Sequence, residues 1–242
     1  MPRFFVDEIN EENITLIGDN AHHIGRSLRM RTGEEITVCC CGVDYNCRIS
    51  QITSDTVYLE LINKERCAAE PSVQVTLFQA VPKLDKLEHI IQKSVELGVH
   101  RIVPVLTRRC ISRPDEKDFS KKLVRLNKIA EEAAKQSGRG MIPEVTPLVT
   151  YKQALAMMSE LDRTILLYEE QGGCSFGNAD LEGAKTVGLV IGSEGDGMRD
   201  GVRKCCDFTV SIPMSGHVNS LNAAVAAGVV LFEAQAKRHK ED

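Results

Sequence analysis

The feature that most constrains this chain is a change in its hydrophobic pattern near residue 73. Before that point the chain has short β-strand patterns separated by turn signals such as Thr32-Gly33, Cys41-Gly42 and Ser54-Asp55. After it, near-continuous apolar strands alternate with helical stretches. Apolar strands separated by helices are typical of a mostly parallel sheet covered on both faces. The sequence therefore predicts a small β-barrel-like domain over residues 1–70 and an α/β domain over residues 73–242.

The expected elements follow from periodicity. In the first part we expect strands at residues 35–38, 46–52 and 56–61 and a helix at 20–30. In the second we expect strands at 75–81, 101–107, 163–169, 186–191 and 208–212, and helices at 85–97, 119–136, 152–161, 200–204 and 221–237. The last helix carries one apolar stripe rich in alanine and glycine, which favours close packing against the sheet or another subunit.

Composition limits the class of protein. The 242 residues are 43% hydrophobic and 26% charged, as in an ordinary globular protein. No apolar run is long enough to span a membrane, and the acidic pair Asp7-Glu8 soon after the first residue argues against a signal peptide. The nine cysteines form no Cys-x-x-Cys pair, so we expect free thiols in a reducing cytoplasm. A zinc site at Cys39, Cys41 and Cys47 would have the wrong spacing.

Charge is distributed unevenly along the chain. The formal net charge is −4, yet basic side chains outnumber acidic ones across residues 83–139. A localised basic surface of this kind meets phosphates, although the solvated face of a lysine-rich helix would give the same pattern.

Two glycine-punctuated loops carry the strongest chemical signal. They are Ile-Gly-Ser-Glu-Gly-Asp-Gly at 191–197 and Ile-Pro-Met-Ser-Gly-His-Val-Asn-Ser-Leu-Asn at 212–222, and each follows a short apolar strand. Glycines at strand ends let backbone groups approach a ligand, so the pair predicts a backbone-built pocket for a small polar cofactor. A P-loop is excluded because no Gly-Lys-Ser/Thr follows, while a dinucleotide turn has its third glycine misplaced by one.

The second loop ends at the start of a helix. Ser220 or Asn222 could cap the exposed backbone N–H groups there, but capping explains one of them and not both. Ile212 and Met214 could offer backbone groups to the edge of a purine while their side chains cover its faces.

These loops, with the helix start Ser-Leu-Asn-Ala-Ala-Val-Ala-Ala at 220–227, resemble the cofactor-binding half of the SPOUT methyltransferases. The resemblance implies S-adenosyl-L-methionine as cofactor and a C-terminal trefoil knot, which is an exceptional feature among folds. No metal is implied.

Further motifs resemble the RsmE family. They are Met-Pro-Arg-Phe-Phe-Val at 1–6, His-His-Ile-Gly-Arg-Ser-Leu-Arg-Met-Arg-Thr-Gly at 22–33, Pro82-Lys83, the segment 91–104, and Ala-Ala-Lys-Gln-Ser-Gly-Arg at 133–139 with Pro143-Glu144. The resemblance implies a PUA-like RNA-binding domain followed by a SPOUT domain. It also implies a homodimer that methylates N3 of uridine 1498 of 16S rRNA in the 30S subunit.

The two loops depart from the RsmE pattern, which usually has Gly-Pro-Glu-Gly-Gly and Ile-Leu-Arg-x-Glu-Thr-Ala there. The Val-Asn-Ser-Leu-Asn-Ala-Ala segment at 218–224 is instead similar to the TrmH/SpoU branch, whose members methylate ribose 2′-hydroxyls. The alternatives therefore stay open: a 2′-O-ribose methyltransferase, a non-catalytic RNA-binding assembly factor, or an oxidoreductase that uses residues 192–201 as a dinucleotide turn.

The resemblance also assigns residues. It implies cofactor contacts from nine positions: Leu167, Gly192, Glu194, Gly195, Ile212, Met214, Ser220, Leu221 and Asn222. A cation near the uracil oxygens would stabilise the N3 anion, for which Arg109 is the first candidate and Arg139 the second, with Asn222 a further catalytic candidate. Phosphate contacts are expected from Arg26, Arg29, Arg31 and Lys83.

Overall fold

The computed structural model describes residues 1–82, 84–107, 114–168, 175–192, 200–214 and 221–236. By their internal contacts they form two compact units, Met1–Glu70 with Ala134–Ile142, and Pro71–Ala133 with Pro143–Asp242. The short segment Ala134–Ile142 therefore groups with the first unit, whereas the sequence placed it in the second domain. None of the described helices is long and apolar enough to cross a membrane.

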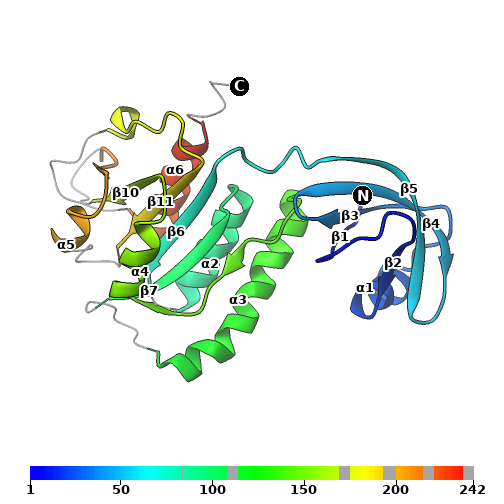
Figure 1. Cartoon of the computed structure of the whole chain (residues 1–242). Helices are drawn as coiled ribbons and strands as arrows, with labels where there is room; N and C mark the ends of the chain where they lie inside the picture. The colour runs from blue at the N-terminus through cyan, green and yellow to red at the C-terminus, as the bar shows by residue number, and fades with distance from the viewer. Residues whose placement is uncertain (83, 108–113, 169–174, 193–199, 215–220, 237–242) are drawn as a thin grey trace. The chain divides into compact units, whose positions relative to one another are not determined.

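The first unit contains a five-stranded sheet in the order β1-β3-β4-β5-β2 (Figure 1). Its strands are β1 (Arg3–Phe5), β2 (Ile14–Ile17), β3 (Glu35–Cys40), β4 (Val43–Ile52) and β5 (Thr56–Arg66). β1 pairs with β3 in parallel, and the other pairs are antiparallel. The sheet ends at β1 and β2, so it is a half-barrel whose edge strands are not paired with each other.

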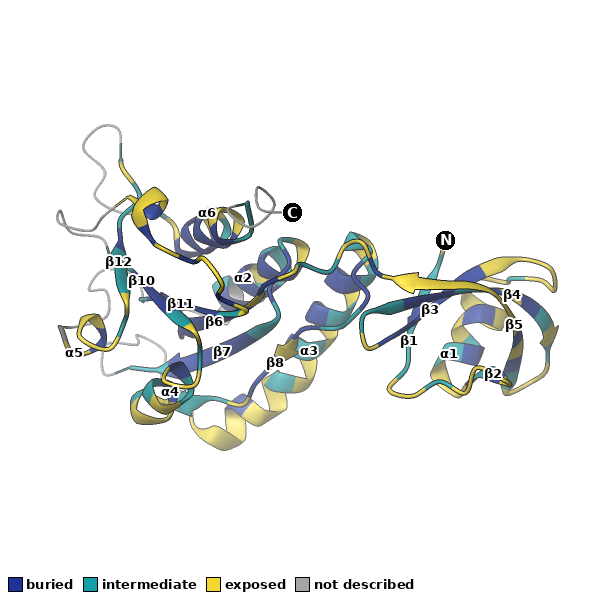
Figure 2. Ribbon diagram, turned by 45° about the horizontal axis from the view of Figure 1, so that its top comes forward, coloured by how far each residue is buried: buried dark blue, intermediate teal, exposed yellow. Residues whose placement is uncertain are grey.

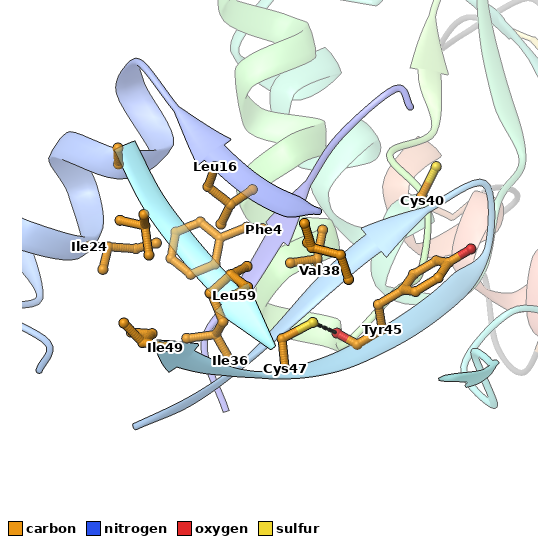
Figure 3. Close-up of a cluster of buried hydrophobic side chains, with 13 residues drawn as sticks. Phe4, Leu16, Ile24, Ile36, Val38, Cys40, Tyr45, Cys47, Ile49 and Leu59 are labelled. Carbon is orange, nitrogen blue, oxygen red and sulfur yellow. Dashed lines mark hydrogen bonds between the residues drawn. The ribbon is translucent and has the colours of Figure 1, made fainter. Parts of the chain in front are cut away.

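One hydrophobic cluster lies inside this sheet (Figure 3). Phe4, Ile36 and Val57 come from three different strands and are all buried. Successive residues of a strand point to opposite faces, so burial alternates along much of β4 and over the first four residues of β5. The exposed second half of β5 lies beyond the region that this core covers.

The β3–β4 connection shows how local sequence determines the hairpin. Cys41 and Gly42 both have positive φ, 51° and 79°, and they join the paired residues Cys40 and Val43. Two residues with positive φ make a hairpin turn that matches the twist of the flanking strands. The predicted turn at Cys41-Gly42 is thereby confirmed.

The expected helix at 20–30 is shorter and irregular. α1 (Asp19–His22) passes directly into the π-helix η1 (His23–Ser27), in which the Leu28 N–H donates to the His23 carbonyl. The chain then reverses at Arg29, whose φ of 52° is left-handed and ends the helix.

The second unit contains a seven-stranded sheet in which every pairing is parallel. Its strands are β6 (Gln74–Ala80), β7 (Arg101–Leu106), β8 (Glu144–Val145), β9 (Val149–Thr150), β10 (Arg163–Leu167), β11 (Thr186–Ile191) and β12 (Phe208–Val210). The order is β12-β10-β11-β6-β7-β8, with β9 also beside β7. The predicted parallel sheet is confirmed.

Helices cover both faces of this sheet, as Figure 2 shows, with α2 and α6 on one face and α4 on the other. The helices are α2 (Leu84–Glu96), α3 (Glu116–Ser137), α4 (Tyr151–Met158), α5 (Asp200–Arg203) and α6 (Ala223–Ala236), with a 3₁₀ turn, η2, at Phe176–Asn178. Because both faces are covered, the central strands are buried at almost every position. α4 packs through Ala154 and Met158 onto Phe78 and Val190 of the sheet.

The expected strands and helices of this unit are present with ends shifted by a few residues. Helix α3 begins at Glu116, three residues earlier than expected. The Asp115 side chain caps it there by accepting from the Asp118 N–H at 2.7 Å. The short strands β1, β2, β8 and β9 carried too little pattern to be predicted. Residues 193–199 and 215–220 lie outside the described residues, so the knot stays an expectation.

Candidate cofactor and RNA-binding sites

The strand order places a topological switch point between β6 and β11. These strands are neighbours, but the chain leaves β6 toward β7 on one side and leaves β11 toward β12 on the other. Open parallel sheets bind ligands outside the carboxyl ends of their strands, at the point where the connections diverge in this way. The topology alone therefore indicates a site beyond Ala80 and Ile191.

Several residues expected to bind the cofactor lie at this edge. Leu167 is the last residue of β10 and is in register with Ile191, after which Gly192 follows directly. β12 ends at Val210, also in register with Leu167, so Ile212 lies two residues beyond the same edge. The fold brings together Leu167, Gly192 and Ile212 from three separate segments of the chain. Their contact with a cofactor stays a prediction.

The sequence did not indicate two further side chains at this edge. The Tyr168 backbone N–H donates to the Val210 carbonyl at 2.9 Å, which joins the ends of β10 and β12. The Arg203 guanidinium lies 5.4 Å from the centroid of the Tyr168 ring, a cation–π distance. Nothing in the spacing of these residues could have paired them, because the contact depends on the strand order.

Asn222 is the N-cap of α6. Its Oδ1 accepts a hydrogen bond from the Ala224 N–H at 2.9 Å, and its backbone carbonyl accepts from the Ala226 N–H. The capping role that the sequence offered as one explanation is therefore present. Leu221 and Met214 are half-buried close to these segments in the sequence. Glu194, Gly195 and Ser220 lie outside the described residues.

Arg139 lies in the interior of the first unit, with a side chain only 2% exposed. Its Nε and a terminal nitrogen each donate to the Glu70 carboxylate at 2.8 Å. Glu70 also accepts from the backbone N–H groups of Gly140 and Met141, at 2.8 and 3.2 Å. This arrangement supports a structural role for Arg139 in place of the expected catalytic one. Arg109, the other catalytic candidate, lies outside the described residues.

Three of the predicted RNA contacts share one short segment of the first unit. Arg26 lies in η1, Arg29 in the turn after it and Arg31 shortly beyond, and all three are exposed. Among the described residues, no ion pair engages any of their guanidinium groups. Exposed guanidinium groups that form no such ion pair are suited to contacts with phosphates. Lys83, the fourth prediction, lies outside the described residues.

The basic middle of the sequence maps partly onto α3. Lys117, Lys121 and Lys128 recur at helical spacing on its exposed side, with Val124 between them 76% exposed. Lys121 has one weak acidic neighbour, Asp118 at 3.8 Å. The solvated helix face considered from the sequence is therefore present, and its charge is positive.

The described cysteines, seven in number, are all free thiols. Burial raises the pKa of the Cys39 thiol and of the Cys206 thiol to about 12, so both are protonated at neutral pH. Within the described ranges no three His, Cys, Asp or Glu side chains come close enough to hold a metal ion.

Two family models and one relative cover most of the chain. The model of an RNA methyltransferase domain matches residues 69–203, and that of an RNA methyltransferase PUA domain matches residues 16–62. The chain is 33% identical over 208 residues to ribosomal RNA small subunit methyltransferase E of Bacillus subtilis, covering 81% of each. The chain belongs to the RsmE family.

The structure of an RsmE from Neisseria gonorrhoeae, bound to S-adenosyl methionine, has a TM-score of 0.83 at 25% identity over 98% of each chain. The chain is also 42% identical over 103 residues to the 23S rRNA (guanosine-2′-O-)-methyltransferase RlmB of Vibrio parahaemolyticus, 39% of each chain. RsmE membership confirms the predicted fold class, a PUA-like sheet followed by a parallel α/β methyltransferase domain. It also confirms the predicted enzyme class, an RNA methyltransferase dependent on S-adenosylmethionine.

Proposed function

We propose that this RsmE-family protein transfers a methyl group from S-adenosylmethionine to N3 of uridine 1498 of 16S rRNA, within the small ribosomal subunit in the cytoplasm. The observation that carries the proposal is the 33% identity to a small-subunit methyltransferase across 81% of both chains, which extends over both units. The position of Leu167, Gly192 and Ile212 at the carboxyl edge of the sheet supports a cofactor site at that edge.

The residues at the site fit this cofactor. Gly192 and the half-buried Ile212 and Met214 follow parallel strands, where backbone groups and apolar side chains can hold an adenosine. When bound, S-adenosylmethionine supplies a methyl group on a positively charged sulfur. The chain would keep this methyl in line with the acceptor nitrogen. Arg109 is proposed to stabilise the negative charge that the uracil oxygens gain as N3 loses its proton.

RNA would be held through its phosphates by both units. Arg26, Arg29 and Arg31 on the first unit and the lysines of α3 on the second are exposed cations. Contacts of this kind fix orientation without reading sequence, and they make binding dependent on salt. The family's preference for one nucleotide would then come from the shape of the RNA.

The predicted homodimer would use the exposed side of α6. Val225, Val229 and Phe232 are 52%, 38% and 59% exposed and recur at helical spacing. An exposed apolar row on a helix that otherwise packs on the sheet is typical of a protein interface. Analytical ultracentrifugation tests this: Phe232→Asp should yield monomers, and a wild-type protein that is monomeric at micromolar concentration would contradict it.

A second candidate function is 2′-O-ribose methylation. The Ser-Leu-Asn sequence at 220–222 and the 42% identity to RlmB over 103 residues favour it. The acceptor atom is decided by incubating the protein and labelled S-adenosylmethionine with 30S subunits that lack the modification. Nucleoside mass spectrometry then identifies the product.

N3-methyluridine at position 1498 would support the proposal. A 2′-O-methyl nucleoside would replace it with the second candidate. Cofactor binding without any methylated product on 30S subunits, on their free 16S rRNA or on other cellular RNAs would favour the non-catalytic assembly factor.

A further inference from the structure

One buried polar side chain at the switch point has unused hydrogen-bonding capacity. Gln79 is the second-last residue of β6 and is fully buried, with 0% exposure. Its Nε2 donates to the Ala80 carbonyl at 3.0 Å and to the Gly192 carbonyl at 3.4 Å. Its Oε1 is also buried, and no hydrogen-bond donor among the described residues reaches it.

The orientation of this amide is determined by its neighbours. Both contacts are with carbonyl oxygens, which only accept hydrogen bonds, so the atom facing them must be the nitrogen. The oxygen is therefore directed away from these two carbonyls. Rotating the amide by 180° would place three acceptors together and lose both hydrogen bonds.

The side chains beside Gln79 on the neighbouring strands cannot supply a hydrogen-bond donor to its Oε1. It is in register with Ile191 on one side and Pro104 on the other, and Ile191 is in register with Leu167. Register partners in parallel strands project to the same face, so Gln79 is the polar member of an otherwise apolar row. A buried acceptor that no described residue satisfies is destabilising if it stays unpaired, and such acceptors are rare in native proteins, so it points to a further partner such as a ligand.

We infer that Gln79 is a positioning residue for the cofactor. Its Nε2 holds the Gly192 carbonyl at the entrance to the first glycine loop, and its Oε1 accepts a hydrogen bond from an N–H or O–H donor of the bound S-adenosylmethionine. The molecule carries three such classes of donor: the adenine amino group, the ribose hydroxyls and the methionine ammonium. This inference rests on the proposed function.

The test is cofactor binding by Gln79→Met, which conserves volume and removes both polar groups. Isothermal titration calorimetry with S-adenosylmethionine should show an affinity at least about tenfold below that of the wild-type protein. The matched control is Ser94→Ala: the Ser94 hydroxyl on α2 is likewise buried without a partner among the described residues, but it lies toward the other end of the sheet. Ser94→Ala should bind the cofactor as the wild-type protein does.

A second measurement uses the unaltered protein, in case Gln79→Met does not fold. The side-chain ¹⁵N–¹H₂ resonances of Gln79 should shift when S-adenosylmethionine is added. A dissociation constant for folded Gln79→Met within twofold of wild type, or Gln79 resonances that do not move on saturation, would overturn the inference. Failure of the wild-type protein to bind S-adenosylmethionine at all would instead contradict the proposed function.

Discussion

The buried ion pair between Glu70 and Arg139 allows a quantitative prediction about stability. Glu70 accepts from the Arg139 side chain and from the backbone N–H groups of Gly140 and Met141. The two charged side chains are 9% and 2% exposed, so solvent cannot replace a lost partner. Removing Glu70 should therefore leave the buried guanidinium without this carboxylate partner.

Two substitutions at this position separate the contributions. Removing one partner of a buried pair costs about 3–5 kcal/mol. Glu70→Gln should lower the free energy of unfolding by about 3 kcal/mol, because the amide oxygen can still accept from the Gly140 and Met141 N–H groups. Glu70→Leu should lower it by about 5 kcal/mol, because the Gly140 and Met141 N–H groups also lose their acceptor. The melting temperature would then fall by roughly 10–20 °C for Glu70→Leu.

The assay is equilibrium unfolding in urea, followed by circular dichroism. The matched control is Glu88→Gln, which breaks the ion pair of Glu88 with Arg125, whose side chain is 72% exposed. An exposed pair of this kind contributes about 0–1 kcal/mol. Equal effects of Glu70→Gln and Glu88→Gln would refute the argument from burial.

A further variant, Arg139→Met, tests the role of Arg139. If Arg139 is structural, Arg139→Met should lower stability but leave the turnover of the folded fraction within a few-fold of wild type. A loss of turnover of about a hundredfold or more in folded Arg139→Met would support the catalytic role that the sequence suggested.

Three other outcomes follow from the local geometry. Asn222→Ala should cost about 1 kcal/mol through loss of the α6 cap, measured by urea unfolding, and should weaken cofactor binding in calorimetry. The double substitution of Arg26 and Arg29 by Gln should weaken RNA binding and flatten its salt dependence, measured by filter binding at several salt concentrations. Gly140→Ala should destabilise by at least about 1–3 kcal/mol in thermal unfolding, because its Cβ would lie 2.5 Å from the Cys67 Cβ.

Each of these has a control or a contrary result. The control for the first is Asn222→Asp, which keeps the cap. Equal cofactor affinity in Asn222→Ala and the wild-type protein would show that Asn222 only caps α6. An unchanged salt slope in the arginine double variant would show that the first unit does not contact phosphates. Gly25→Ala meets no atom within 4 Å and should be tolerated; a similar loss of stability in both glycine variants would contradict the packing argument.

Local patterns in the sequence carried much of the fold. Near-continuous apolar strands separated by helices are a property of each segment, and so they predicted the parallel sheet and most of its elements. Motifs of neighbouring residues likewise carried the resemblance to RsmE. The sequence could also place Gly192 and Ile212 at strand ends, because a strand's end is a local feature. Leu167 ends β10 two residues before the expected end of that strand.

Contacts between segments far apart in the sequence could not be predicted in this way. Gln79 and Gly192 are 113 residues apart, and Glu70 and Arg139 are 69 apart. Their contacts depend on which strands pair and on the path of the chain between them, and periodicity within one segment says nothing about that pairing. A glutamine in an apolar strand therefore indicated no role until the strand order put its amide beside the Gly192 carbonyl.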